Sequence, residues 1–436
     1  MARDRGRSPG AVAKAHQGTG RIKEQVLRGL LRGESQESQV EMLRRRYHRL
    51  ETDILATEPA DVLEPYLASF AHAFDPHSDY FKPSTNADFD IEMSNSLEGI
   101  GATLRTEGEY TLVYSLVPGG PAQQGEELQP GDRIVAVAQG SEPPVDVVDE
   151  RIDKVVKQIR GPKGTEVRLT VIPVDAPDPS HTRVIRITRD QVILAADDAE
   201  SRVIEVPGQD GQGIKLGLID IPSFYQDFQA RRGGDPEFKS TTRDVKQLLT
   251  ELKAEEVSGI ILDVRRNGGG SLNESVELTG LFIPQGPVVQ IGDRSGRTEA
   301  MYDPDPAVVY DGPLMVLTSP LSASASEILA GAIQDYDRGL VVGSASTHGK
   351  GTVQNVIDLD PVLRRFVRYP TPDDLAGAVK VTTHKFYRVS GASTQLRGVQ
   401  ADVVLPSPFD GLELLEGDLD YVLGWDRVAP LTYREI

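Results

Sequence analysis

The stretch "GIILDVRRNGGGSLNESVELTGLF", residues 259–282, decides the fold. A short apolar run ends in three glycines, and apolar residues three and four positions apart follow, so the pattern predicts a buried strand, a tight turn and a helix. Similar strand-like runs at 215–221, 313–318 and 339–343 alternate with helical segments at 241–255 and 324–336. This strand–helix–strand order predicts a parallel sheet flanked by helices over residues 191–406.

Composition narrows the class of protein. The 436 residues suffice for several domains, and 39% hydrophobic residues allow a buried core. The chain has no cysteine, which excludes thiol catalysis, Fe–S clusters, cysteine zinc sites and disulfides. A net charge of −19 argues against nucleic acid or an anionic membrane as the main partner. No apolar stretch reaches the ~18 residues of a transmembrane helix.

The rest of the chain divides by texture into four regions. Residues 1–20 are basic and lack the apolar h-region of a signal peptide, so we expect a disordered lead-in. Residues 21–96 are mainly helical in pattern, with a helix-ending Asp75-Pro76. Residues 97–190 contain short strands and turns, typical of a compact β-rich domain. Residues 407–436 form an acidic tail that contains Trp425.

The glycines Gly268, Gly269 and Gly270 leave backbone N–H groups uncovered at a strand-to-helix turn. Such donors suit a developing oxyanion or a phosphate, although a tight turn alone would also explain them. The phosphate alternative is weak. "GSASTHGKGT" fails as a Walker A loop, because five residues separate Gly343 from Gly349 and a glycine follows the lysine.

A second motif, "LSASASEILAGAIQDY", covers residues 321–336. Ser324 and Glu327 have capping-box spacing before an apolar run. A serine at a helix N-terminus can cap, but it can also attack, because the helix dipole favours its alkoxide. The N–H of Ala325 would then face the oxyanion. Ser322 and Ser326 are competing candidates.

A serine nucleophile needs a base, and two lie downstream. His348 titrates near ~6.5 without tuning, whereas Lys350 starts near ~10.4 and must be desolvated to act. Gln354 lies four residues after Lys350 in a strand-like segment, where it would share a face with the amine. His348 has the same parity, so the pattern itself leaves both bases open.

Several motifs in order resemble the C-terminal processing peptidases, and in particular the periplasmic tail-specific proteases of Gram-negative bacteria. They are "DPHSDYFKP", "SLEGIGATL", "PGGPA", "GDRIVAV", "IRGPKGT", "LDVRRNGGG", "SASASEILAGAIQDY", "GKGTVQ" and "HKFYRVSGASTQLRGVQADVVLP". The resemblance covers about residues 40–430. It implies an α+β multidomain protein with an N-terminal helical region, a PDZ-like β-rich domain at 97–190 and an α/β protease core with a sheet flanked by helices.

The resemblance also implies a serine–lysine endopeptidase that needs no cofactor and no metal. Carried over by motif, it gives a nucleophile, a base, its supporting residue and two oxyanion donors: Ser324, Lys350, Gln354, Ala325 and Gly269. It favours Lys350 over His348. Asp335 of "QDY" is expected to be structural. The loop "GSASTHGK" is one residue longer than the usual family pattern.

In the PDZ-like region, the N–H groups of Ile100, Gly101 and Ala102 are expected to hold a terminal carboxylate while the peptide adds as a strand. The implied partners are polypeptides with apolar C-termini and an adaptor or regulatory protein. The family location is the periplasm or cell envelope, with the cytoplasm as the alternative, because the chain shows no signal peptide. Without that signal and the family's helical extension, we expect a fragment or a shortened member. Alternative functions are a non-catalytic peptide-binding scaffold and a small-ester hydrolase.

Overall fold

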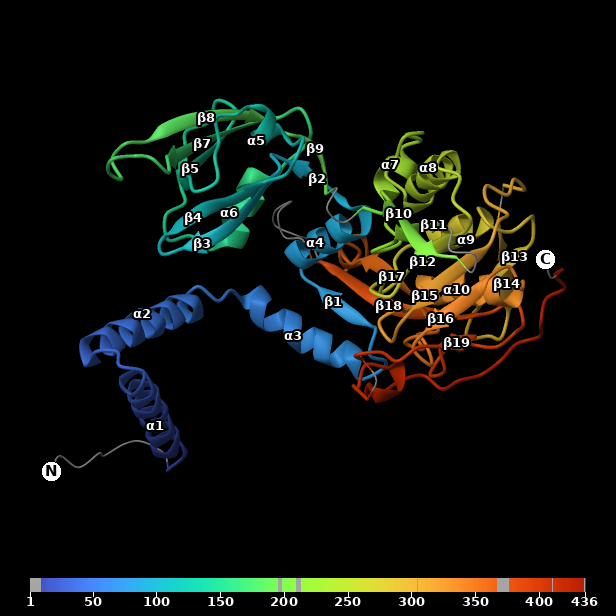
Figure 1. The fold of residues 1–436 in the computed structure, drawn as a ribbon. Helices are drawn as coiled ribbons and strands as arrows, with labels where there is room; N and C mark the ends of the chain where they lie inside the picture. The colour runs from blue at the N-terminus through green and yellow to red at the C-terminus, as the bar shows by residue number, and fades with distance from the viewer. Residues whose placement is uncertain are drawn as a thin grey trace. The chain divides into compact units, whose positions relative to one another are not determined.

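The computed structural model (Figure 1) describes residues 9–194, 198–208, 213–303, 305–366, 376–409, 411–434 and 436. The chain divides into two compact units, residues 1–63 and 64–436, and each has its own description below. Within the described ranges, no helix combines the length and the apolar character that crossing a membrane requires.

The first unit is helical. It contains α1 (Pro9–Leu31), α2 (Gln36–Leu55) and the start of α3 (Pro59–His72). The Ser35 side chain caps α2 by accepting a hydrogen bond from the Ser38 N–H at 3.1 Å. The sequence predicted disorder for residues 1–20, but helix α1 begins at Pro9. The run "AVAKA" at 11–15 contains good helix formers, and a proline is tolerated in the first turn. Residues 1–8 of that segment lie outside the described residues.

The second unit begins with the rest of α3, which ends before Asp75-Pro76, as predicted. A short strand and a helix follow: β1 (Asp79–Phe81) and α4 (Pro83–Ser94). Strand β1 lies within residues 21–96, the region that the sequence pattern predicted to be mainly helical. Its three residues are too few to show a periodic pattern, and they become a strand by pairing with a segment about 300 residues later.

The β-rich domain is an antiparallel sheet of order β3-β4-β5-β7-β8, with β6 paired to β5. Its elements are β3 (Ala102–Glu107), β4 (Tyr110–Leu116), α5 (Pro121–Gln124), β5 (Arg133–Gln139), β6 (Val145–Asp146), α6 (Ile152–Ile159), β7 (Glu166–Ile172) and β8 (Arg183–Thr188). Val167, Leu169 and Val171 of β7 are fully buried, as period-two alternation demands. β2 (Ser96–Gly99) pairs with β9 (Asp190–Ile193) and brings the two ends of this domain together.

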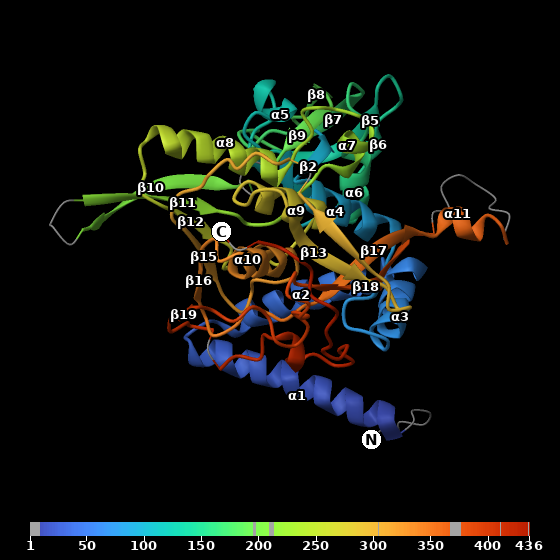
Figure 2. The same ribbon diagram turned by 90° about the vertical axis from the view of Figure 1, so that its right-hand side faces the viewer.

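The larger sheet has the order β10-β11-β12-β15-β16-β19. Its strands are β10 (Glu200–Pro207), β11 (Gly213–Asp220), β12 (Ile260–Asp263), β15 (Leu314–Thr318), β16 (Leu340–Gly343) and β19 (Val403–Val404). All neighbours from β11 to β19 pair in parallel, which confirms the predicted parallel sheet, and β10 adds an antiparallel edge. Figures 1 and 2 show these strands side by side with α10.

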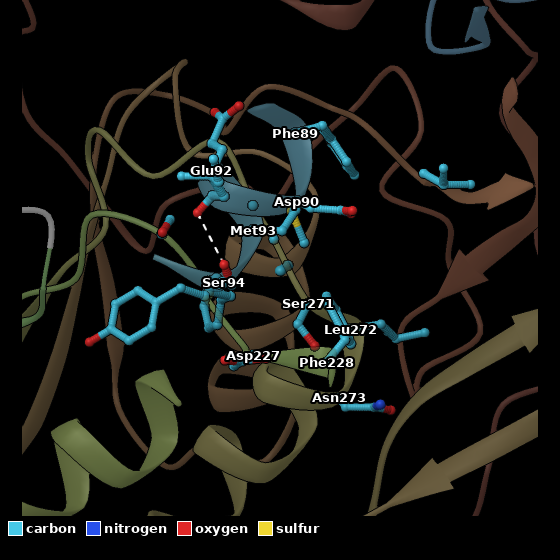
Figure 3. Close-up of a pocket in the computed structure, with 18 of the residues that line it drawn as sticks. Phe89, Asp90, Glu92, Met93, Ser94, Asp227, Phe228, Ser271, Leu272 and Asn273 are labelled. Atoms are coloured by element: carbon cyan, nitrogen blue, oxygen red, sulfur yellow. Dashed lines mark hydrogen bonds between the residues drawn. The ribbon is translucent and has the colours of Figure 1, made fainter. Parts of the chain in front are cut away.

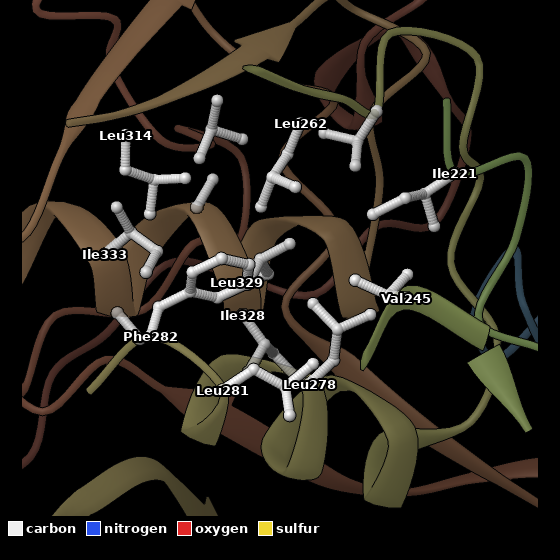
Figure 4. Packing of buried hydrophobic residues seen from close by; sticks show 14 of the residues in the cluster. Ile221, Val245, Leu262, Leu278, Leu281, Phe282, Leu314, Ile328, Leu329 and Ile333 are labelled. Atoms are coloured by element: carbon white, nitrogen blue, oxygen red, sulfur yellow. The ribbon is translucent and has the colours of Figure 1, made fainter. Parts of the chain in front are cut away.

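Helices from the crossovers build the main hydrophobic core on this sheet. They are α8 (Thr241–Ala254), α9 (Leu272–Gly280) and α10 (Ala325–Asp335), with the short α7 (Phe228–Arg232) before α8. Figure 4 shows Leu262 and Leu314 from the strands packed with Ile328, Leu329 and Ile333 from α10. The sequence alternation of strands and helices therefore becomes one continuous core.

A second, antiparallel sheet was not predicted from the sequence. It has the order β1-β18-β13-β14, with β17 also paired to β18. Its remaining elements are β13 (Pro287–Gly292), β14 (Thr298–Tyr302), β17 (Thr352–Asp358) and β18 (Ala378–Tyr387), and α11 (Asp360–Leu363) follows β17. The pairings of β18 with β1 and with β13 join segments about 300 and 100 residues apart, so the sequence contains no local signal for the whole sheet.

The C-terminal segment packs against the core. Its short 3₁₀ turn (Glu416–Asp418) contains a fully buried glutamate. The Trp425 indole N–H donates to the Ser393 carbonyl at 2.9 Å, and the Leu431 N–H donates to the Val389 carbonyl at 2.9 Å. Although the segment is acidic in sequence, these contacts make it part of the second unit.

Candidate active site

Ser324 sits where α10 begins, beyond the carboxyl end of β15. Its φ is 56° and its ψ is −111°, a backbone conformation that non-glycine residues rarely adopt. Strain of this kind costs of order 1–3 kcal/mol and concentrates at functional sites. The Ser324 N–H donates to Glu327 Oε2 at 2.7 Å, which is the glutamate half of the predicted capping box.

The two competing serines are committed to structural hydrogen bonds. Ser322 is fully buried, and its hydroxyl donates to the Val264 carbonyl at 2.8 Å. Ser326 is also fully buried, and its hydroxyl donates to the Asn267 carbonyl at 2.9 Å. Of the three serines, Ser324 is the one that lines the adjoining cavity.

That cavity has a volume of about 1340 Å³. Ser324, Lys350 and Gln354 all line it, so the structure brings the predicted nucleophile, base and supporting residue to one space. Figure 3 shows the part where Asp90 and Met93 of α4 lie opposite Ser271 and Leu272 at the start of α9. The cavity lies at the carboxyl ends of parallel strands, where open α/β sheets place their ligands.

The glycine turn after β12 lies directly beside Ser324. Gly269 and Gly270 have φ values of 117° and 138°, which favour glycine. A Cβ on Gly269 would lie 2.9 Å from the Ser324 Cβ, and one on Gly270 would lie 2.4 Å from the Phe224 carbonyl oxygen. Side chains are therefore excluded from this turn both by conformation and by space.

The two predicted oxyanion donors, Gly269 and Ala325, differ in whether their N–H groups already have an acceptor. The Gly269 N–H already donates to Asn267 Oδ1 at 2.9 Å, so in this structure it is not available to an oxyanion. The sequence pattern missed this because the asparagine side chain folds back over its own turn. Among the hydrogen bonds of the described residues, the N–H groups of Gly268, Gly270 and Ala325 have no acceptor.

Lys350 is a half-buried residue just before β17. Burial, reinforced by the positive charge of Lys380, lowers the pKa of its amine to about 8. Within the described part of the chain, no acceptor is recorded for Nζ. A substantial fraction of the amine is therefore neutral at mildly alkaline pH, as a general base requires.

His348 is two residues away but belongs to another environment. It is absent from the cavity lining, and its Nδ1 lies 3.6 Å from Glu416 Oε2. Burial lowers the pKa of its imidazole. The backbone N–H of His348 donates to the Ser322 carbonyl at 3.0 Å. The sequence pattern did not distinguish the two candidate bases, but in the structure Lys350 lines the same cavity as Ser324 and His348 does not.

Gln354 does not bond to Lys350 among the described contacts. Its Nε2 donates to Thr352 Oγ1 at 2.9 Å and to Thr382 Oγ1 at 3.0 Å. Lys350 precedes β17, so the alternation argument covers Gln354 as a strand residue but not Lys350. The tertiary fold nevertheless places both residues at the cavity.

Glu327 has a larger role than the cap that its sequence position predicted. Its carboxylate is fully buried and accepts four hydrogen bonds, from Ser324 N, Lys350 N, Gly349 N and Thr347 Oγ1, at 2.7–3.0 Å. Burial raises its pKa to about 8, although these donors act in the opposite direction. One side chain thus fixes the backbones of the nucleophile and the base.

Asp335, at the other end of α10, has structural partners. Its Oδ1 accepts from Arg388 Nη2 at 2.6 Å and its Oδ2 accepts from Ser390 Oγ at 3.1 Å. It is absent from the residues that line the cavity. These contacts join α10 to the segment after β18, which agrees with the structural role expected from the sequence.

The candidate carboxylate loop of the β-rich domain lies before edge strand β3. The carbonyls of Ile100 and Gly101 accept from the Ala122 and Val117 N–H groups, each at 2.8 Å. Their own N–H groups have no acceptor among the recorded backbone bonds, and Gly101 has a φ of 72°. Ala102 begins β3, so a peptide strand could add at this edge.

Three family matches cover most of the chain. Residues 14–84 match the "Tail specific protease N-terminal domain", residues 88–172 match the "PDZ domain" and residues 215–405 match "Peptidase family S41".

The chain is also similar to proteins of known sequence and to a solved structure. The chain is 39% identical to the tail-specific protease of Haemophilus influenzae over 90% of this chain and 53% of that protein. It is 29% identical to the chloroplastic carboxyl-terminal-processing peptidase 2 of Arabidopsis thaliana over 75% of this chain and 61% of that protein. A solved photosystem II D1 C-terminal processing protease matches with a TM-score of 0.43 and 26% identity, over 84% of this chain and 88% of that one. The chain thus spans between half and two thirds of these two sequence relatives.

Proposed function

We propose, on the premise that this chain belongs to the tail-specific proteases of peptidase family S41, that it is a serine endopeptidase of the serine–lysine type. Ser324 is the nucleophile and Lys350 is the general base. One observation carries the proposal. Of the three serines in the motif, only Ser324 lines the cavity, and Lys350, with its lowered pKa, lines the same cavity.

The chemistry follows from these positions. Neutral Lys350 accepts the proton of the Ser324 hydroxyl as Oγ attacks the scissile carbonyl. The N–H of Ala325, together with that of Gly268 or Gly270, holds the oxyanion, because these donors have no acceptor among the described residues. Protonated Lys350 then gives its proton to the leaving amine, and an acyl-enzyme remains on Ser324. Water, deprotonated by Lys350, hydrolyses this ester and restores the enzyme.

Selection of substrates is assigned to the PDZ domain. A peptide is added antiparallel to edge strand β3, and its terminal carboxylate accepts from the Ile100 and Gly101 N–H groups. The substrate class is therefore polypeptides with free, apolar C-termini. An adaptor or regulatory protein as partner, and a periplasmic location, are proposed from the family alone.

A non-catalytic peptide-binding scaffold is the alternative, and the site argues against it. Peptide binding by a scaffold requires neither a strained serine nor a desolvated amine at the same cavity. Both features cost stability, because positive φ disfavours serine and burial disfavours the ammonium form of Lys350.

Ser324→Ala tests the proposal directly. An unfolded substrate with an apolar C-terminus is incubated with wild type, with Ser324→Ala and with the matched controls Ser322→Ala and Ser326→Ala. We expect Ser324→Ala to abolish fragment formation while the protein stays folded, since losing a cap costs only ~1 kcal/mol. Continued cleavage by folded Ser324→Ala would refute the assignment, and loss in a folded control variant alone would move the nucleophile by two residues.

A further inference from the structure

A buried carboxylate in the segment after α3, that of Asp75, is connected through the Thr382 hydroxyl to Gln354 at the cavity. Asp75 is 6% exposed and accepts from the His77 N–H at 3.0 Å, from the Ser78 N–H at 3.1 Å and from Thr382 Oγ1 at 2.8 Å. The Ser78 hydroxyl also donates to it. Burial alone would raise the pKa of Asp75, but these hydrogen bonds outweigh it and the net shift is downward. Asp75 is therefore ionised near neutral pH and can only accept.

This carboxylate determines the direction of the next hydrogen bond. The Thr382 hydroxyl has one proton, which it donates to Asp75. Toward Gln354 it can therefore only accept, and it does so from Nε2 at 3.0 Å. The amide nitrogen of Gln354 is thus held on the Thr382 side, and Oε1 is left as the acceptor for a group in the cavity.

A β-bulge places Thr382 for this contact. In the β17–β18 pairing, Val353 lies opposite His384, but the next residue, Gln354, lies opposite Thr382. Thr383 is the extra residue on β18, and its hydroxyl oxygen accepts a hydrogen bond from Asn355 Nδ2 at 2.9 Å. Bulges of this kind redirect side chains next to active sites. Without it, Gln354 would face Thr383.

We propose that Asp75 and Thr382 are positioning residues for the base, acting through Gln354. The oriented Oε1 accepts one N–H of the neutral Lys350 amine, which turns the nitrogen lone pair toward Ser324. An amide flipped the other way would donate to the amine lone pair and so occupy the electrons that must accept the Ser324 proton. This inference rests on the proposed function, because Lys350 is a base only in that reaction.

Thr382→Val tests the relay, since valine keeps the shape and removes the hydroxyl. The matched control is Thr383→Val, the same change at the bulged neighbour, and Thr382→Ser is the rescue variant. Each protein is assayed for the rate at which a fluorophosphonate labels Ser324, and for kcat and KM on an unfolded substrate. We expect Thr382→Val to lower the labelling rate and kcat at least tenfold with KM unchanged, and the other two to stay within about threefold of wild type.

The outcomes separate the two proposals. Wild-type protein that is not labelled at Ser324 would overturn the proposed function, and this inference with it. Normal labelling of Thr382→Val, or equal losses in Thr382→Val and Thr383→Val, would overturn the relay alone. Asp75→Asn should also lower kcat and add little to Thr382→Val, because both act through Gln354. Fully additive losses would exclude Asp75 from the relay.

Discussion

The two halves of the candidate site are built in different ways. The nucleophile half, Ser324 with β15 and α10, belongs to the parallel core, and nine of the eleven residues of α10 are buried. The base half, Lys350 with β17 and β18, belongs to the antiparallel sheet, and four of the seven residues of β17 are exposed. Glu327 accepts from the backbone N–H groups of both halves. Beyond this shared contact, close packing of α10 fixes the serine, whereas the hydrogen bonds that Gln354 donates to Thr352 and Thr382 hold the segment of the base.

This difference predicts which substitutions change the stability of the fold and which change mainly the catalytic rate. A change in the nucleophile half disturbs a close-packed core, so it acts on folding as well as on chemistry. A change in the base half removes polar contacts at a partly exposed sheet, so it should act mainly on rate. The predictions below test that separation, from the largest expected effect to the smallest.

Removing the amine should have the largest effect. We expect Lys350→Ala to lower kcat roughly 10²–10⁴-fold, because general base catalysis is lost. Lys350→Arg should fail as well, since a guanidinium does not release its proton at working pH. His348→Ala is the control and should keep substantial activity. A dead His348→Ala beside an active Lys350→Ala would reverse the assignment and point to a serine–histidine mechanism.

Glu327→Gln should break the connection between the two halves. The amide keeps one acceptor oxygen but replaces the other by donors, so it cannot accept four buried hydrogen bonds. We expect a loss of about 2 kcal/mol in unfolding free energy and a fall in kcat of at least about tenfold. Thermal melts and peptide cleavage measure the two effects. Unchanged kcat with lowered stability would limit Glu327 to a structural role.

The pH dependence should sharpen the comparison. The pKa of Lys350 lies below its ordinary value, at about 8, so kcat/KM should rise with pH through about 8 and fall about tenfold per unit below it. Between pH 8 and the ordinary lysine pKa of 10.5, the Lys350 amine is mostly neutral in the folded state and mostly protonated in the unfolded state. The free energy of unfolding should therefore rise with pH over this range.

Glu327 titrates in the same range, with a pKa of about 8. The pH profile of Glu327→Gln separates the two groups. The rising limb should persist in that variant if it belongs to Lys350. Its disappearance would assign the limb to Glu327.

Tail recognition should give the smallest effect, because it lies outside both halves. Amidating the C-terminus of a substrate removes the charge that the Ile100 and Gly101 N–H groups are proposed to hold, and should raise KM about tenfold with kcat unchanged. Gly101→Ala should act similarly. Gly108→Ala is its matched control, with a comparable positive φ of 63° and no atom within 4 Å of the new Cβ. Equal KM for free and amidated substrates would remove tail selection but leave the protease proposal intact.

Local patterns in the sequence were sufficient for much of the fold. Apolar runs between turns marked the parallel strands, and the β-rich domain was predicted from its short strand-like runs and turns. Both signals depend on neighbouring residues in the sequence. The motif around Ser324 located a candidate nucleophile, and the chemistry of Lys350 was open to inference once a base was required. These features depend on neighbours within a few positions.

Long-range contacts decided the rest. Only the tertiary structure separated Ser324 from Ser322 and Ser326, because their partners Val264 and Asn267 lie about sixty residues earlier. It likewise turned His348 away from the cavity and engaged the Gly269 N–H with Asn267. The bulge that sets Thr382 opposite Gln354 depends on how two strands pair, and pairing register is a property of the folded sheet that neither strand carries in its own sequence.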